Sequence, residues 1–360
     1  MKVKPYLEHL ARESYVEEGP VAVQEFLLDC SLGINSFGTS ASVLNAAREY
    51  NWSRVWHYPD PSYKDLKEEI RKLWLDHADL ETEQIQISHG ASAVLQRLNQ
   101  IFIGLGAKVL GYSPQFTEYV TEVEACGGKY EAVVLNPEEN FRFHVERLLA
   151  RISREYCLIY IDNPNNPTGQ IIDLEEIEEI VKQAKTKDVT VVVDEAYGDY
   201  MEGESSAINL IRKYSNLAVV RSFSKGFGLA SLRVGYGVLP TELTRYYNKI
   251  NLPFSVSSVS CYLAKEALLD KDFIHDCQAR IQKEKSKLIQ KLRERGYLIS
   301  KTSDSCPIFV LGCKDRDTNL RKELLSKGIL TVAGTDFRNL GNNYVRVNIP
   351  AKAEEFSGHL

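Results

Sequence analysis

The stretch LAVVRSFSKGFGLASLR, residues 217–233, joins a short apolar run to a segment rich in small and polar residues. Its first four residues predict the end of a buried strand, and Ser222, Ser224 and Lys225 follow beside two glycines. A lysine in such a place is suited to lose its proton and form an imine, so we interpret Lys225 as a reactive amine. The two serines and Arg233 would then bind an anion such as a phosphate. By itself the stretch is equally compatible with a Ser/Gly turn that carries an incidental lysine.

Strands and helices alternate along the chain on both sides of this stretch. The predicted strands cover residues 84–88, 108–112, 130–135, 157–161, 189–193, 217–220 and 234–239. The predicted helices between them cover residues 64–77, 93–104, 117–126, 145–152 and 174–187. This β-α-β alternation predicts an α/β fold with a mostly parallel sheet of the seven-stranded type and helices on both faces. Ligands of such sheets bind at the carboxyl ends of the strands.

The pattern changes beyond residue 260, and we expect a large domain of residues 36–260 and a smaller α+β domain made of residues 1–35 and 261–360. Residues 258–295 predict a long charged helical stretch with a break near Asp270. A strand at 308–311, a helix at 320–327 and a strand at 344–349 follow. The tail after Ile349 is short and lacks the pattern of a closing helix.

Composition excludes several classes of function. The net charge is −5 and no long basic block occurs, so nucleic acid is not an expected partner. No apolar run is long enough for a membrane span and the first residues lack a secretory signal, so we expect a soluble, cytoplasmic protein. Seven cysteines without a Cys-x-x-Cys spacing read as reduced, mostly buried thiols, and the scattered histidines predict no metal site.

Unusual residues follow several of the predicted strands. Asp194 comes directly after the most apolar strand, so its carboxylate needs a cation, such as a protonated pyridine, unless a helix terminus holds it. The loop of residues 162–169 contains Asn166 and could also be a simple turn. The segment of residues 89–92 opens a helix whose N–H groups can hold an anion.

Together these residues form the ligand set of pyridoxal 5′-phosphate (PLP), whose enzymes use a lysine imine and an acidic partner for the ring nitrogen. Lys225 would form the imine, Asp194 would pair with the pyridinium, and Asn166 and Tyr197 would donate to the phenolate oxygen. The phosphate would bind to Ala91, Ser92, Ser222, Ser224 and Arg233.

Seven motifs along almost the whole chain make it similar to the class I/II aminotransferase family of PLP fold type I, nearest to the histidinol-phosphate aminotransferase branch. They are YPDP (58–61), HGAS (89–92), SPQF (113–116), NNPTG (165–169), DEAY (194–197), SFSKGFGLASLRVGYG (222–237) and YVRVNI (344–349), in the family's order.

The resemblance implies further roles for five residues. Phe116 should stack on the pyridine ring, and Tyr58 should reach the cofactor phosphate of a neighbouring subunit, which implies a homodimer with shared active sites. Arg346 should bind the substrate α-carboxylate, and Asn35 and Asn166 should lie beside the substrate. The residues alone also allow a core aromatic at 116, a turn tyrosine at 58 and a surface arginine at 346.

The expected reaction begins when an L-amino acid or related amine displaces Lys225 and forms an external imine, after which Lys225 and Asp194, with Tyr197, support removal of the α-proton. Transamination is the first interpretation. Elimination or cyclisation of an arginine-type amino acid, as in capreomycidine-synthase-like enzymes, would use nearly the same residues. A non-catalytic sensing module is a third possibility, which the joint presence of Lys225, Asp194 and Arg346 disfavours.

Two departures from the family concern the substrate. Relatives that bind a substrate phosphate carry an arginine where this chain has Val332, and Arg338 is the one evident replacement, so a phosphorylated substrate is not favoured. Glu13, Glu17 and Glu18 form an acidic cluster that could receive a guanidinium or could be a solvated charge run. The sequence leaves the substrate, the amino acceptor and the pathway open.

Overall fold

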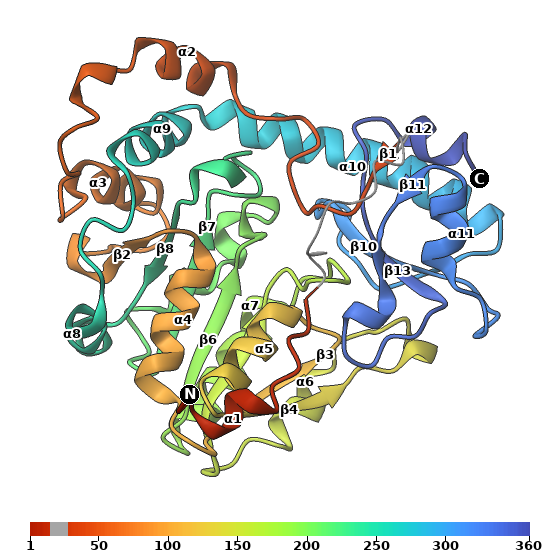
Figure 1. The fold of residues 1–360 in the computed structure, drawn as a ribbon, viewed down its shortest axis with the longest axis horizontal. Helices are drawn as coiled ribbons and strands as arrows, with labels where there is room; N and C mark the ends of the chain where they lie inside the picture. The colour runs from red at the N-terminus through yellow and green to blue at the C-terminus, as the bar shows by residue number, and fades with distance from the viewer. Residues whose placement is uncertain (15–27) are drawn as a thin grey trace.

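The computed structural model describes residues 1–14 and 28–360, and a seven-stranded sheet forms its centre (Figure 1). β8 runs antiparallel to both of its neighbours and the other pairings are parallel. This confirms the predicted α/β fold with a mostly parallel sheet. In spatial order the strands are β2 (Ile85–Ser88), β8 (Gly235–Val238), β7 (Leu217–Ser222), β6 (Thr190–Glu195), β5 (Tyr156–Asp162), β3 (Lys108–Ser113) and β4 (Lys129–Val134).

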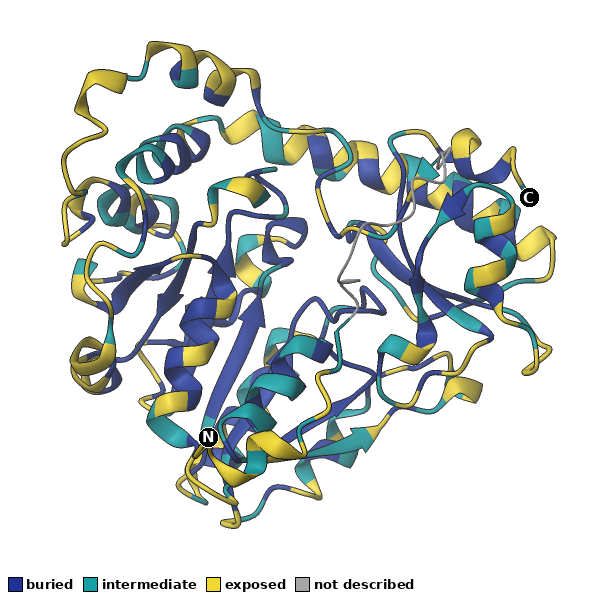
Figure 2. Ribbon diagram, viewed as in Figure 1, coloured by how far each residue is buried: buried dark blue, intermediate teal, exposed yellow. Residues whose placement is uncertain are grey.

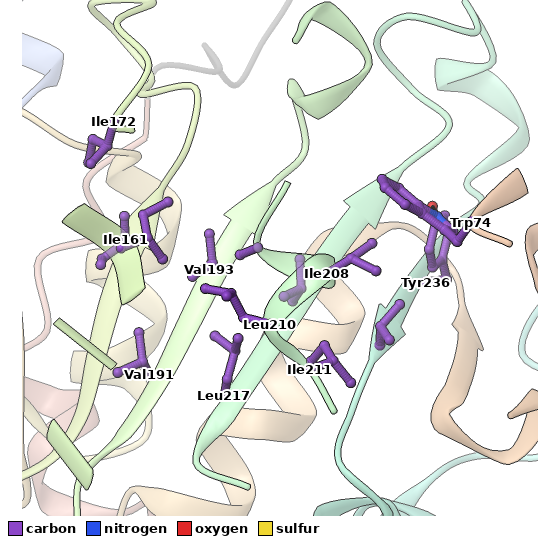
Figure 3. Packing of buried hydrophobic residues seen from close by; sticks show 14 of the residues in the cluster. Trp74, Ile161, Ile172, Val191, Val193, Ile208, Leu210, Ile211, Leu217 and Tyr236 are labelled. Atoms are coloured by element: carbon purple, nitrogen blue, oxygen red, sulfur yellow. Dashed lines mark hydrogen bonds between the residues drawn. The ribbon is translucent and has the colours of Figure 1, made fainter. Parts of the chain in front are cut away.

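The two faces of this sheet bury alternate residues of the central strands. Leu158 and Val192 join one apolar cluster, with α4 (Ala91–Phe102), α5 (Thr117–Ala125) and α8 (Thr241–Ile250). Ile159, Val191 and Val193 join the other cluster, in which Figure 3 shows Val191 and Val193 beside Leu210 and Leu217. That second face is covered by α3 (Lys64–Leu73), α6 (Val145–Leu149), α7 (Leu174–Lys185) and α9 (Ser258–Leu269). Burial on both faces explains why these strands read as continuous apolar runs (Figure 2).

A second, antiparallel sheet lies at the other end of the molecule. Its strands are β12 (Val332–Ala333), β13 (Tyr344–Asn348), β10 (Ile308–Gly312) and β9 (Leu298–Ile299). Residues of β9, β10 and β13 pack with α10 (Lys271–Glu294) and α11 (Leu320–Ser326) in a separate apolar cluster. The short strand β1 (Leu28–Asp29) pairs with β11 (Ile329–Leu330) beside this sheet. The first two α-helices in the sequence are α1 (Pro5–Glu8) and α2 (Ala41–Glu49).

The tail after Ile349 does form a closing helix, α12 (Ala353–Ser357), so the expectation of none is wrong. Phe356 is fully buried, and the Ala353 amide donates to Glu284 Oε2 on α10 at 2.9 Å. Five residues are too few to produce a helical period, and tertiary packing supplies the stability of such a short helix.

Backbone contacts join the two sheets close to the predicted site. The Ser303 amide donates to Gly169 O at 2.9 Å, and Ser300 Oγ donates to Thr168 O at 3.3 Å. Gly169 has a φ of +71°, and a Cβ there would lie 2.1 Å from Ile308 O. Only glycine therefore allows the loop of residues 162–169 to approach the second sheet this closely.

The side chain of Lys285, on α10, is fully buried against residues 302–308, the segment that contacts Gly169. Its ammonium donates to Thr302 Oγ1 at 2.6 Å, to Ser303 O and Cys306 O at 2.7 Å, and to Ile308 O at 3.0 Å. Burial lowers the pKa of Lys285 to about 8. The Lys285 ammonium thus hydrogen-bonds to four oxygens of the segment that contacts Gly169.

Among the described residues, no helix is both long and apolar enough to cross a membrane. All seven cysteines are unpaired. Three of them are buried and the other four are half-buried, which is less burial than the sequence led us to expect.

Candidate active site

A cavity of about 200 Å³ lies at the carboxyl ends of β5, β6 and β7. Its wall contains each residue predicted to bind the cofactor within one chain: Ala91, Ser92, Phe116, Asn166, Asp194, Tyr197, Ser222, Ser224, Lys225 and Arg233. The residues come from five separate segments, and the parallel strands bring the segments to one edge of the sheet.

One end of the cavity is built to hold an anion. Gly90, with a φ of +93°, precedes the first turn of α4, where Ala91 and Ser92 begin the helix. A Cβ on Gly90 would lie 2.8 Å from Arg233 Nη2, so the missing side chain leaves the guanidinium beside the helix N-terminus. Arg233 Nη1 donates to Ser224 Oγ at 3.2 Å, and Ser222 Oγ accepts from the Ser224 amide at 3.1 Å. A guanidinium, two hydroxyls and a helix N-terminus together suit a phosphate.

Asp194 lies in the same wall at the end of β6 and is 4% exposed. Its Oδ2 accepts from the Tyr160 hydroxyl at 2.8 Å, and its Oδ1 accepts from the Ala196 amide at 2.9 Å. Burial raises the pKa of Asp194 to about 7, and the neighbouring carboxylate of Asp162 adds to the rise. A cationic partner in the cavity would stabilise the ionised carboxylate, as the sequence predicted.

Lys225 follows β7, and its Nζ donates to Gly33 O at 2.6 Å and lies 4.9 Å from the centroid of the Tyr197 ring. Burial, followed by the charge of Arg346, lowers the pKa of Lys225 to about 8. About one amine in ten is then neutral at pH 7, far more than for an ordinary lysine. This supports its interpretation as a nucleophile and base.

Sequence reasoning missed Gly33. A Cβ there would lie 1.9 Å from Tyr197 Oη and 3.1 Å from Lys225 Nζ, so a larger residue would block the approach of this backbone to the lysine. The only local signal is a glycine in the run SLGINSFG, and such a signal does not identify its distant partner. Asn35, from the same run, donates through Nδ2 to Gly226 O at 2.7 Å and so lies next to the lysine loop.

Arg346 reaches the site from β13 of the second sheet and is fully buried. Its Nη1 donates to Asn166 Oδ1 at 3.0 Å, and its Nη2 donates to Ser31 O. Val332 is its direct partner across the β12–β13 pair and is 3% exposed. The neighbour of Arg346 across this strand pair is therefore an apolar, buried side chain.

Arg338, the one replacement for a phosphate-binding arginine that the sequence offered, is bound to two carboxylates of its own chain. Its guanidinium pairs with Glu13 Oε2 at 2.8 Å and with Glu124 Oε1 at 2.9 Å. It lines a different cavity, together with Tyr112 and Ser113. The Glu13 carboxylate is thus already bound by a cation of its own chain, while Glu17 and Glu18 lie outside the described residues.

Tyr58 does not line the cavity that contains Lys225. It is 82% exposed and packs on Phe254, with the ring centroids 4.9 Å apart. Its predicted contact with a second subunit stays a prediction.

The donor set of the cavity fits PLP. The cradle at Gly90 suits its phosphate, the buried carboxylate of Asp194 suits a protonated ring nitrogen, and the depressed pKa of Lys225 suits reaction with its aldehyde. Phe116 in the cavity wall offers an aromatic face, although no contact with a ring is defined by the protein alone.

Comparison with known proteins agrees with this fit. The sequence model of the family "Aminotransferase class I and II" matches residues 27–357. The histidinol-phosphate aminotransferase of Halorubrum lacusprofundi is 34% identical over 248 residues, which are 69% of this chain and 66% of that protein. The enzyme of the same name from Methanocaldococcus jannaschii is 28% identical over 349 residues, 97% of this chain and 91% of that protein.

Solved structures resemble the fold over nearly the whole chain. Histidinol-phosphate aminotransferase from Sinorhizobium meliloti, solved in complex with PLP, gives a TM-score of 0.84 at 23% identity and covers 99% of this chain and 96% of its own. A mutant of Thermus thermophilus aspartate aminotransferase gives 0.85 at 21% identity, with coverages of 99% and 97%. The chain therefore belongs to the class I and II aminotransferases and is a PLP-dependent enzyme of fold type I.

Proposed function

We propose that this enzyme transfers the amino group of an unphosphorylated L-amino acid, or a closely related amine, to a keto acid. The observation that carries the proposal is the convergence of Lys225, Asp194 and Arg346 on one site, from β7, β6 and the second sheet. A base, a partner for the ring nitrogen and a carboxylate-binding guanidinium are the three functions that transamination of an amino acid requires.

Each of these residues has a separate task. The bound cofactor supplies a ring that withdraws electrons from the substrate α-carbon. Asp194 would hold a proton on the ring nitrogen, and Lys225 Nζ would take the α-proton and pass it to the cofactor carbon within the same half of the reaction. Arg346 binds the α-carboxylate through two parallel hydrogen bonds, which fixes the direction of the Cα–H bond. Ala91, Ser92, Ser222, Ser224 and Arg233 would hold the phosphate, and Asn166 and Tyr197 would donate to the ring oxygen.

The choice of an unphosphorylated substrate rests on two side chains. Val332, beside Arg346, offers no charge to a substrate phosphate, and the Arg338 guanidinium is engaged by Glu13 and Glu124. The same Glu13–Arg338 pair removes one carboxylate from the cluster that could have received a guanidinium, so elimination or cyclisation of an arginine-type substrate gains no support from it.

A panel of L-amino acids, with histidinol phosphate included, tests this function by mass spectrometry. With a keto acid present we expect many turnovers, and without it about one equivalent of product per active site, because the amino group stays on the enzyme. Repeated turnover without any acceptor would contradict transamination. Conversion of histidinol phosphate at a rate equal to that of the preferred amino acid would contradict the substrate assignment.

Replacing Arg346 with lysine is expected to lower kcat/KM for the preferred amino acid by about 100-fold, because an ammonium cannot form the two-pronged carboxylate contact. The matched control is the decarboxylated amine of the same substrate, whose slower reaction should change little. An equal loss for both compounds would show that Arg346 acts on the fold or the cofactor and not on the carboxylate.

We also propose that two chains form a homodimer in which Tyr58 of each chain reaches the cofactor phosphate of the other. Val55, Trp56 and Tyr58 are 58%, 77% and 82% exposed, and such a group of large exposed side chains is typical of an interaction surface. Sedimentation should give the mass of two chains. Mixing inactive Lys225→Ala and weakened Tyr58→Phe proteins should produce dimers with one fully intact site, and failure of activity to recover would contradict shared sites.

We propose two further properties, a division into domains and a cellular location. We propose a large domain of residues 36–260 and a small domain of residues 1–35 and 261–360. The separate apolar cluster around α10 and β10 supports a second unit, whereas α9 packs with the core of the large sheet. We place the enzyme in the cytoplasm, where seven unpaired thiols stay reduced.

A further inference from the structure

Tyr160 contacts Asp194 directly, although Tyr160 has no role in the proposed proton transfers or in substrate binding. It lies in β5 and is fully buried, with a relative exposure of 0%. Its hydroxyl donates to Asp194 Oδ2 at 2.8 Å. The second oxygen of Asp194 accepts from the Ala196 amide at 2.9 Å. The direction of the carboxylate is thus set by one backbone group and one side chain.

A second buried carboxylate makes this contact important. Asp162 and Asp194 are paired in register at the ends of the neighbouring strands β5 and β6, and they are 3% and 4% exposed. Asp162 accepts hydrogen bonds from the Asn166 amide at 2.9 Å and from the side chains of Tyr112, Gln115 and Asn165 at 2.8, 2.9 and 3.0 Å. An adjacent buried anion favours the neutral form of Asp194, and a hydrogen bond from Tyr160 favours the ionised form.

The ring of Tyr160 is held in place by a second tyrosine. Tyr119, on α5, stacks on it with the centroids 3.5 Å apart and the planes 12° apart. The Tyr119 hydroxyl in turn donates to Asn99 Oδ1 at 3.0 Å. With both rings buried and stacked, the Tyr160 hydroxyl has little freedom to leave Asp194.

We propose that Tyr160 is a positioning residue that keeps the Asp194 carboxylate ionised and aimed into the cavity, and thereby sets the affinity for PLP and the proton on its ring nitrogen. The proposal rests on the assignment of Asp194 made above. It differs from a merely structural role, in which Tyr160 would use Asp194 only to satisfy its own buried hydroxyl.

The test compares the holoenzyme with three variants: Tyr160→Phe, Tyr119→Phe as the matched control, and Asp194→Ala. Tyr119→Phe removes a buried hydroxyl from the neighbouring ring without touching Asp194. Two readouts other than activity are used, the dissociation constant of PLP from each protein and the ring-nitrogen NMR resonance of isotope-labelled PLP at neutral pH.

For Tyr160→Phe we expect PLP to bind about 10-fold more weakly, because a hydrogen bond to a charged group is lost. The ring-nitrogen resonance should move toward that of a neutral pyridine, because a more basic Asp194 draws the shared proton to itself. Tyr119→Phe should resemble the wild type in both readouts. A fluorinated tyrosine at position 160 donates more strongly and should move the resonance in the opposite direction, which keeps the test decisive if Tyr160→Phe folds poorly.

The outcomes separate the two assignments. If Asp194→Ala changes both readouts while Tyr160→Phe and the fluorinated tyrosine change neither, Tyr160 is only structural and the inference fails. If Asp194→Ala leaves the ring-nitrogen resonance unchanged, the assignment of Asp194 itself is wrong. Equal changes in Tyr119→Phe and Tyr160→Phe would also overturn the proposal, since they would report general loosening of the core.

Discussion

Replacing Lys225 with alanine is expected to lower kcat by about 10²–10⁴-fold, the range of a lost general base, while the protein still folds and binds PLP. The amine is the group in the cavity whose pKa, about 8, allows a substantial neutral fraction near neutral pH. The phosphate cradle and Asp194 come from other segments and remain in the variant. Single-turnover measurements with the preferred amino acid would isolate the proton-transfer step from product release.

Small primary amines provide the control for this variant. If Lys225 acts as a base, added amine should restore part of the lost rate, and the restored rate should depend on the basicity of the amine. A Lys225→Ala enzyme with full turnover would end the proposed mechanism. In the wild type, the rate at which the apoenzyme reacts with PLP should rise with pH, with a midpoint near 8, because only the neutral amine is a nucleophile.

Replacing Lys285 with methionine is expected to lower the free energy of unfolding by about 3 kcal/mol, because buried oxygens around the ammonium lose their donor. Three of the acceptors are backbone carbonyls, those of Ser303, Cys306 and Ile308, and a methionine cannot replace the bonds to them. Because Ser303 also binds Gly169 O, we expect weaker PLP binding as a secondary effect. Urea unfolding of the holoenzyme at saturating PLP measures the first effect.

Lys287 is the matched control for this second variant. It lies on the same helix, its side chain is 42% exposed, and its contact with Glu284 is a surface pair. Lys287→Met should change the free energy of unfolding by less than about 1 kcal/mol. Similar losses for the two variants would mean that the helix surface, and not the caged ammonium, accounts for the effect.

The fold was largely predictable because burial on both faces leaves a strong signal in a parallel strand. The all-β-branched run before Asp194 and the run before Lys225 could be recognised without knowing their neighbours. The polar residues after each strand could then be placed at one edge by the general topology of such sheets. Elements of two residues, such as β1, β11 and β12, have no period to detect, and they form because their partners are already in place.

The residues of the site that were missed depend on register and distant contacts. The hydrogen bond from Tyr160 to Asp194 follows from the pairing of Asp162 with Asp194, which places neighbouring strands in one register. The sequence of β5 presents Tyr160 simply as one member of an apolar run. In the same way, the need for glycine at position 33 arises from the Tyr197 hydroxyl, which lies more than 160 residues further along the chain.

The pairing of Val332 with Arg346 across β12 and β13 also bears on how such an enzyme can change during evolution. Both side chains belong to the second sheet, whereas Lys225, Asp194 and the phosphate cradle belong to the first. Under the proposed role of Arg346, a mutation at position 332 would alter which compounds are accepted and leave the cofactor's surroundings intact. With the α-carboxylate bound from the second sheet and the proton moved on the first, selection could revise one without having to rebuild the other.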